Sequence, residues 1–284
     1  MRAWWSAPLI IGAFAALFWL ERRRPLRSAV EPKVTRTARN LTVAGISAVA
    51  LQLTEAPAAL GLAALVERHN LGLLKLVSLP VWLETLLGVV LLDYTLYVWH
   101  VLTHKVPFLW RFHLVHHVDL DLDASTALRF HFGELAVSVP WRVVQVIVIG
   151  VSPLSYLTWQ LFMFLSILFH HSNVELPIRM ERWLNRLFVT PRMHGIHHSI
   201  VHEEADSNWS SGLTIWDRLH GTLRLNVPQR EITIGVPAYR KPEDVELLKI
   251  LPMPFGKQRP SWQLPDKGEP RREALPMPSD NLLP

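Results

Sequence analysis

The sequence predicts an all-α membrane protein, namely a polytopic helical bundle with a histidine-rich helical cap for two metal ions on its cytoplasmic face. Three observations favour this class. Half of the 284 residues are hydrophobic and only 19% are charged, a composition too apolar for an ordinary soluble domain. Apolar segments close to the length of a membrane span recur along the chain. Of the 14 histidines, 12 lie between His100 and His202, where they repeat at helical spacing.

Composition also excludes several classes of protein. The chain contains no Cys, which excludes disulfides and thiolate metal sites. The net charge is +5, but the arginines flank apolar segments, so we expect them to face an anionic membrane surface and not nucleic acid. The sequence holds neither a nucleotide-binding fingerprint nor a haem-attachment motif. A redox reaction would therefore need a separate electron donor.

The first apolar segment, residues 4–20, is followed by a cluster of basic residues. A cleaved signal peptide would carry its positive charge before the apolar run. Seven basic residues lie between Arg22 and Arg39, and the positive-inside tendency places this linker in the cytoplasm. Residues 4–20 therefore predict a first membrane helix whose C-terminal end is cytoplasmic.

A second apolar segment covers residues 41–66 and is interrupted by Glu55 and Pro57. It forms either one kinked span or a short re-entrant hairpin, and we favour the kinked span because neighbouring groups can satisfy a carbonyl freed by proline. The two apolar segments and the basic linker make up an N-terminal region, residues 1–78.

Residues 79–99 predict the next span, and they carry Glu84 and Asp93. Carboxylates inside a span are costly and suggest function. Asp93 shares one helical stripe with His100, so it could orient a metal-bound imidazole through the other nitrogen of the ring. A helix–helix hydrogen bond is the alternative role.

The spacing of the histidines predicts metal binding. Residues at i and i+4 leave the same face of a helix, and residues at i+3 lie beside them. Imidazole suits iron, zinc, copper and nickel. Eight imidazoles exceed the about four ligands of a tetrahedral zinc, so two ions are the economical interpretation. His69, His202 and His220 are interpreted as ordinary core or surface groups. The three boxes are His100 and His104; His113, His116 and His117; and His194, His197 and His198.

Two further apolar segments, residues 135–149 and 154–169, are separated by a turn. The first segment takes the chain across the membrane and the second brings it back. The histidines before and after these segments therefore lie on the same side of the membrane. Both segments are short for complete spans, and a hairpin that enters from one face would preserve the arrangement. We expect the histidine boxes at the cytoplasmic face, with residues 154–169 as a candidate wall of a lipid channel.

These boxes, taken in order among apolar segments, resemble the fatty acid hydroxylase and sterol desaturase superfamily of membrane di-iron oxygenases. The stretch NWSSGLTIWDRLHGT at 208–222 is similar to the ending of that family's pattern, and STALRFH at 125–131 is most similar to the alkylglycerol monooxygenase-like bacterial branch. The resemblance covers about residues 85–225. It predicts a catalytic domain at residues 79–225.

The resemblance implies the chemistry. Two iron ions would use O2 to hydroxylate or desaturate an unactivated carbon of a lipid or sterol-like substrate, and the boxes do not separate these outcomes. The electrons would come from a reductase, a cytochrome or ferredoxin type of carrier, or a reduced pterin. No catalytic residue is expected beyond the metal ligands.

The resemblance also implies the ligands, which include His131 between the boxes, although Phe132 stands where proline is common. His170 is a rival for the place of His171. Asp93, Asn208 and Asp217 are expected to support the ligands from outside, with Trp216 beside them. The ten expected ligands are His100, His104, His113, His116, His117, His131, His171, His194, His197 and His198.

Residues 226–284 are expected to form a proline-rich, partly disordered C-terminal tail. The stretch 223–284 holds 11 of the 21 prolines. Residues 242–251 predict a short helix, and the chain beyond Pro260 is expected to be extended or disordered. We expect a multi-pass protein whose active site faces the cytoplasm, and the excess of Arg over Lys favours a bacterial inner membrane.

Two other functions remain open. A membrane zinc hydrolase would use fewer imidazoles and a carboxylate base, for which Glu134, Glu203 and Glu204 are candidates. A non-catalytic metal-binding membrane protein would place its ligands along a path inside the spans. The excess of clustered imidazoles favours the oxygenase over both alternatives.

Overall fold

The computed structural model describes residues 6–272 of the chain. In this part every helix is an α- or 3-10 helix, and extended pairing is limited to three isolated β-bridges. The all-α class predicted from the sequence is confirmed. The α-helices are α1 (Ser6–Arg23), α2 (Lys33–Leu53), α3 (Glu55–His69), α4 (Val81–Lys105), α5 (Pro107–His117), α6 (Phe132–Ile149), α7 (Pro153–His171), α8 (Ile178–Leu184), α9 (Pro191–His197), α10 (His202–Ala205), α11 (Ile215–Leu219) and α12 (Leu247–Ile250).

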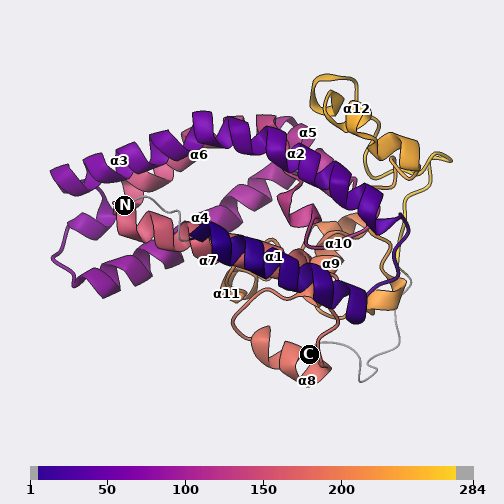
Figure 1. Cartoon of the computed structure of the whole chain (residues 1–284), viewed down its shortest axis with the longest axis horizontal. Helices are drawn as coiled ribbons and strands as arrows, with labels where there is room; N and C mark the ends of the chain where they lie inside the picture. The colour runs from indigo at the N-terminus through magenta and orange to yellow at the C-terminus, as the bar shows by residue number, and fades with distance from the viewer. Residues whose placement is uncertain (1–5, 273–284) are drawn as a thin grey trace.

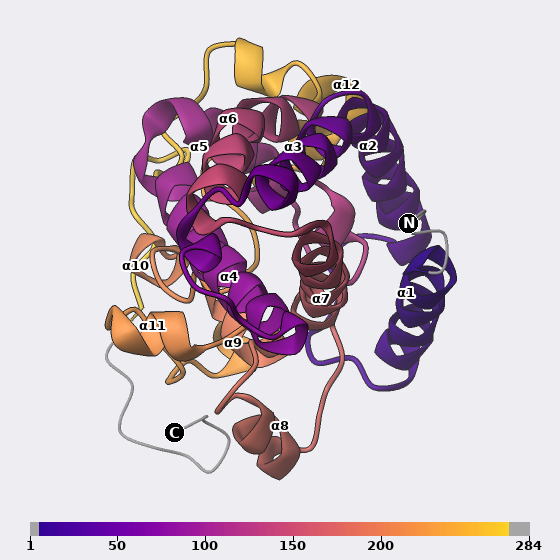
Figure 2. The same ribbon diagram turned by 90° about the vertical axis from the view of Figure 1, so that its left-hand side faces the viewer.

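The long helices run along the longest axis of the molecule, and the short helices α9, α10 and α12 gather toward the end opposite α3 (Figure 1). Helix α7 lies between α4 and α1, while α6 packs against α2 and α3 (Figure 2). Within residues 6–272, three stretches are long and apolar enough to cross a membrane: Lys33–Lys75, Val81–Lys105 and Phe132–Ile149. Helices α1 and α7, which we also expected to cross, have 18 and 19 residues and carry ionisable residues in their last turns.

The break between α2 and α3 falls at Thr54, whose backbone leaves the helical conformation at φ −123° and ψ −75°. Pro57 lies in the first turn of α3, where its missing N–H costs nothing because the first turn has no partner within the helix. The two helices follow one another along one side of the molecule with a bend between them (Figure 1). This geometry is that of a kinked helix and not of a hairpin.

Two glycines meet at the end of the bundle far from the histidines. Gly72, with φ +91°, precedes α4, and Gly150, with φ +82°, ends α6. A Cβ added at Gly72 would lie 2.4 Å from the backbone of Gly150, so only glycine allows the two loops to touch. The contact fixes the turn between α6 and α7 against the loop that leads into α4.

The C-terminal region from residue 226 contributes to the core. Val236, Tyr239 and Ile250 are buried against Leu114 and Val115 of α5. The helix expected at 242–251 is present as the 3-10 helix Pro242–Val245 followed by α12. Residues 273–284, the last part of the expected disordered tail, lie outside the described residues. Burial of this region against α5 places it over one side of the histidine cluster.

A buried ionic network connects the N-terminal linker to the loop after α5. Arg36 donates to Asp119 at 2.9 Å and also pairs with Asp123. Burial alone would raise the pKa of Asp119, but Arg36 and Arg129 lower it to about 2. The arginines of this cytoplasmic linker were expected to face the anionic membrane surface. Arg36 instead is 2% exposed because the aspartates of the loop supply its partners.

Candidate metal centre

The structure brings nine of the ten expected ligands together, in two groups of imidazoles. Within each group, the candidate ligand atoms lie within 4.8 Å of one another. All nine rings are buried except His104, which is half-buried. The first group is His100, His104, His113, His117 and His197, and the second group is His116, His171, His194 and His198.

Helix α5 shows how one box serves two groups. His113 and His117 are four residues apart, leave the same face of the helix and enter the first group. His116 lies to one side of that stripe and enters the second group. The HxxHH pattern therefore places one helix between two neighbouring sites.

Helix α9 and the residue after it repeat this division in reverse. His194 and His198, four residues apart, enter the second group, and His197 enters the first. The two HxxHH boxes thus face each other across the boundary between the groups. This division explains physically why two boxes of the same pattern are needed for two sites.

The distances in the second group fit a shared cation. The Nε2 atom of His171 lies 3.0 Å from Nε2 of His116 and 3.1 Å from Nε2 of His194, and His198 Nε2 lies 3.1 Å from His194 Nε2. Lone pairs so close repel unless a proton or a cation lies between them. A metal–imidazole bond of about 2.1 Å, with about 90° between bonds, would separate neighbouring nitrogens by about 3.0 Å.

The first group contains buried ring nitrogens without a hydrogen-bond partner among the described residues. These atoms include Nε2 of His113, His117 and His197. A buried polar atom without a partner is costly, and a bound metal would satisfy all three atoms at once. Both groups therefore fit resident metal ions.

Four rings are held by acceptors at their other nitrogen. His171 Nδ1 donates to the Ile167 carbonyl at 2.8 Å, and His197 Nδ1 to the Ser207 carbonyl at 2.8 Å. Such bonds fix the tautomer, so that Nε2 keeps its lone pair for a metal.

His100 Nδ1 donates to the Trp209 carbonyl at 2.7 Å, and His113 Nδ1 donates to Glu134 Oε1 at 2.8 Å. Sequence reasoning considered Glu134 only as a base for a hydrolase and did not foresee this bond. One signal could have found it, since a carboxylate at the start of an apolar segment is costly and suggests function.

The imidazoles outside the long helices are held neutral. Burial lowers the pKa of His197 to about 3. Burial, together with the neighbouring rings of His171 and His198 respectively, lowers the pKa of His116 and of His117 well below the ordinary value. A neutral imidazole is the form that binds a metal ion.

Asp93 does not contact an imidazole. Its Oδ2 atom accepts hydrogen bonds from the Leu213 backbone N–H at 3.0 Å and from Trp216 Nε1 at 2.7 Å. The stripe shared with His100 places Asp93 on the correct face of α4, but about two turns away from the ring. Of the two roles expected for Asp93, the structure shows the helix–helix hydrogen bond, from Trp216 of α11, and not the orientation of an imidazole. The bond from Leu213 also holds the loop before α11.

Asn208 and Asp217 also act on this loop. Asn208 Nδ2 donates to the Met193 carbonyl at 2.9 Å, and the two carboxylate oxygens of Asp217 accept from the backbone N–H groups of Trp209 and Ser210 at 3.0 Å. The loop contains the Ser207 and Trp209 carbonyls that hold His197 and His100. Both side chains hold the backbone of this region, and their expected support of metal ligands stays a prediction. No side-chain type in the sequence reveals these carbonyls.

His131 stands outside both groups, contrary to the expectation from the sequence. Its Nδ1 accepts a hydrogen bond from the Gly133 backbone at the start of α6, at 2.9 Å, and its Nε2 donates to the Leu251 carbonyl at 3.0 Å. Both nitrogens are used by the backbone, so neither has a lone pair for a metal. The partner Leu251 comes from the C-terminal region, whose position the sequence does not predict.

The choice between the adjacent rings at the end of α7 favours His171. Its Nε2 points into the second group, whereas His170 hydrogen-bonds to the Ser211 backbone and packs with its ring centroid 4.1 Å from that of His194. His170 is a neighbour of the second group and not a member of it.

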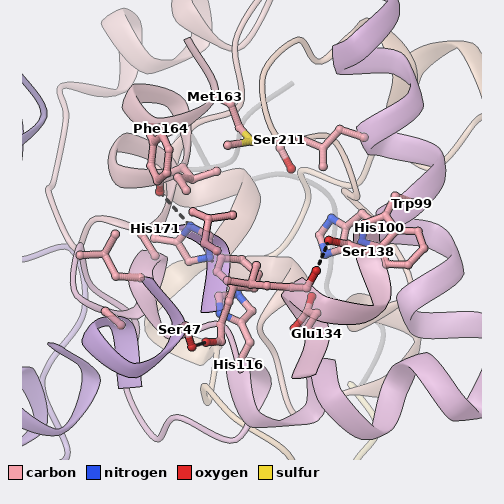
Figure 3. Close-up of a pocket in the computed structure, with 18 of the residues that line it drawn as sticks. Ser47, Trp99, His100, His116, Glu134, Ser138, Met163, Phe164, His171 and Ser211 are labelled. Carbon is pink, nitrogen blue, oxygen red and sulfur yellow. Dashed lines mark hydrogen bonds between the residues drawn. The ribbon is translucent and has the colours of Figure 1, made fainter. Parts of the chain in front are cut away.

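A cavity of about 480 Å³ opens beside both groups. His100 and His116 reach it from the two groups, and Met163 and Phe164 of α7 line it on the other side (Figure 3). Residues of α2, α4 and α6 complete a mostly apolar lining. The sequence indicated α7 as a wall but not α2, which reaches the cavity at Ser47.

An all-helical bundle with apolar helices of membrane length, in which two groups of buried imidazoles adjoin an apolar cavity, defines the class of histidine-box membrane metalloproteins. Residues 85–222 match the family model described as fatty acid hydroxylase, and this region is a domain of that family. The resemblance stated from the histidine boxes is confirmed. No solved structure matches the chain.

Several curated proteins share this region. An ornithine lipid hydroxylase, OlsE, of Rhizobium tropici is 34% identical over 160 residues, which cover 55% of this chain and 46% of that protein. Cholesterol 25-hydroxylase of Mus musculus is 31% identical over 144 residues, 50% of this chain and 47% of that protein. Alkylglycerol monooxygenase of Xenopus tropicalis is 30% identical over 162 residues, 55% of this chain and 34% of that protein. The matched region therefore spans half or less of the length of these relatives.

Proposed function

We propose that this protein is a membrane di-iron oxygenase that uses O2 to hydroxylate an unactivated carbon of a lipid. One observation carries the proposal: two imidazole groups that fit two ions adjoin the same apolar cavity. Ions held by these imidazoles would lie beside the carbon of the lipid chain that is oxidised. A hydrolytic site needs neither a second ion nor so many imidazoles.

Bound iron would supply the activation of O2, and the chain supplies the ligands, their orientation and the substrate cavity. The nine imidazoles would hold the two ions, and Glu134 and the carbonyls of Ser207 and Trp209 orient three of the rings. The apolar lining of the cavity excludes water and favours an alkyl chain or a sterol-like body.

The relatives support hydroxylation over desaturation, because the three curated relatives described above are named as hydroxylases or a monooxygenase. Those names concern an ornithine lipid, cholesterol and an alkylglycerol. For this chain we propose a lipid or sterol-like substrate that enters from the bilayer between the long helices. The electron donor would be a separate molecule.

The proposed setting is a bilayer crossed several times by the chain, with the histidine groups at the cytoplasmic face. The basic linker between α1 and α2 supports this orientation. A bacterial inner membrane fits the excess of Arg over Lys.

The proposal is tested by metal analysis and by lipid analysis on the same variants. Protein purified without O2 should contain two irons per chain, and cells that express it should accumulate a lipid that gains one oxygen from isotopically labelled O2. His116→Ala should lose both properties, whereas the exposed His69→Ala should keep them. One zinc per chain with no oxygenated lipid would instead indicate a hydrolase. Bound metal without any change in lipids would indicate a non-catalytic metal protein.

A further inference from the structure

A row of aromatic rings leads from the surface to the first imidazole group. The side chain of His202 is 54% exposed and stacks on Trp262, with ring centroids 4.4 Å apart and planes at 15°. Trp262 stacks on Trp110 at 5.5 Å and 26°. The Trp110 ring lies 5.0 Å from His104 and 5.5 Å from His117. Each ring contacts the next, so the row has no gap.

The row is assembled from three distant parts of the sequence and is held by specific bonds. Trp110 Nε1 donates to Ser261 Oγ at 3.0 Å, and Gln258 Nε2 donates to the Arg111 carbonyl at 3.1 Å. His202 is held at its outer end by Asp206, at 3.2 Å. These contacts fasten the C-terminal region on α5 at the position of Trp110.

The proposed reaction needs electrons at a site that the protein encloses. The imidazoles of the first group are buried, with His104 half-buried, and the cavity beside them is lined mostly by apolar groups. A soluble carrier therefore cannot touch the ions and must pass electrons through the protein. Trp209 offers another ring near His104, but their centroids are 6.5 Å apart and Trp209 is only 6% exposed.

We propose that Trp262 and Trp110 form the path by which electrons enter the histidine cluster, and that a one-electron carrier docks where His202 and Trp262 meet the surface. The proposal rests on the proposed function. Indole is among the most easily oxidised side chains. Its oxidation needs a strong oxidant such as an excited photo-oxidant, so electrons from the carrier tunnel through the contacting rings without oxidising them.

The electrons balance over one turnover. Lipid RH, O2, two electrons and two protons give ROH and water. Each electron tunnels from the reduced carrier through the contacting rings of Trp262 and Trp110 to the site. The rings are not oxidised in this step, and the carrier is the species oxidised.

The rate of reduction of the iron-loaded protein tests this path without any lipid turnover. Ferric protein is mixed anaerobically with reduced ferredoxin as the probe, and the iron spectrum is followed by stopped flow. We expect Trp262→Leu to slow the reduction about tenfold or more, because leucine fills the space without a ring, and Trp262→Phe to recover most of the rate because a ring again bridges the gap. Trp183→Leu, a change at an exposed ring on α8, should not affect it. Equal rates in the Leu and Phe variants would assign the row a packing role and overturn the proposal.

A second test needs neither iron nor oxygenase activity. Because the chain has no cysteine, Gln263→Cys provides one exposed attachment point for a photo-oxidant next to Trp262. After a light flash on the full metal-free chain, mass spectrometry should find oxidation at Trp110. This oxidation should fall about tenfold with Trp262→Phe and return with Trp262→Tyr. Unchanged oxidation of Trp110 in Trp262→Phe would overturn the path even if the protein is an iron oxygenase. The expected pattern would support the path even if the iron assignment fails.

Discussion

At the scale of single residues, the chemistry depends on which nitrogen of each imidazole is free. Four rings donate from Nδ1 to a carbonyl or carboxylate and leave Nε2 for a metal. Three of those acceptors are backbone carbonyls, which mutation cannot remove simply. Glu134 is the exception, because its side chain is the acceptor for His113. It is therefore the position where the outer support of a ligand can be tested directly.

Glu134→Gln should lower metal affinity by about 10–100-fold, the usual cost of losing an outer partner of a ligand. The amide keeps the shape of the side chain but loses the charge that favours a donating Nδ1–H. Metal titration of the metal-free protein measures the change. Glu203→Gln, at an exposed carboxylate, is the matched control and should leave the affinity unchanged. Full affinity in Glu134→Gln would mean that the bond to His113 does not support metal binding.

His131→Ala should leave the metal content unchanged, because both ring nitrogens are used by the backbone. The variant loses a hydrogen bond at the start of α6 and another to Leu251, so we expect the protein to be destabilised by about 1–2 kcal/mol. Iron per chain and the denaturation midpoint in detergent measure the two effects. A loss of one iron per chain would restore His131 as a ligand.

Helical spacing predicted the convergence of the eight imidazoles in the three boxes, because spacing is a local property, and the family resemblance added His171. The resemblance failed at His131, where the ring caps a helix, and the helical stripe put Asp93 on the correct face but two turns from His100. Both cases concern partners that come from distant segments, namely Leu251 and the loop before α11. A spacing rule describes one helix and carries no information about such partners.

At the scale of elements, the loop that joins α10 to α11 positions two imidazoles of the histidine groups. Asp93 and Asp217 hold its backbone, and its carbonyls hold His100 and His197. The loop approaches α4 closely at Gly212, where an added Cβ would lie 2.4 Å from Asp93 Oδ1. Any side chain at this position would push the loop away from the carboxylate.

Gly212→Ala should therefore weaken metal retention and destabilise the fold by about 1–3 kcal/mol, as overpacking in a core does. Gly61→Ala is the matched control, since its Cβ would meet nothing within 4 Å and alanine favours a helix. Metal lost during dialysis against a chelator, compared between the two variants, measures the effect on the cluster. Equal retention in both variants would show that the loop does not control the imidazoles.

At the scale of the whole molecule, the two ends of the bundle differ in what they contain. One end holds the histidine groups and the C-terminal region that packs on α5. The other end is closed by the contact between Gly72 and Gly150. The sequence predicted that the chain passes twice between the second and third histidine boxes, so that all the boxes lie at one end. It did not predict that the region after residue 226 would be packed, because that region is buried by contacts with α5 and not by its own pattern.

This number of passes predicts which side of the membrane each end of the bundle faces. Helix α4 has 25 residues and is about 37 Å long, enough to carry the chain from the Gly72 end to the histidine end across a bilayer. Because the chain has no cysteine, single replacements at the exposed Ser28, Ser78 and Glu243 can be labelled one at a time with a membrane-impermeant thiol reagent. Ser78→Cys should react from outside intact cells. Ser28→Cys and Glu243→Cys should react only in inverted vesicles, since the basic linker and the C-terminal region lie with the histidines. Labelling of Ser28→Cys and Glu243→Cys from opposite sides would place the basic linker and the histidine cap on different faces of the membrane. That result would contradict a single cytoplasmic site that contacts both regions.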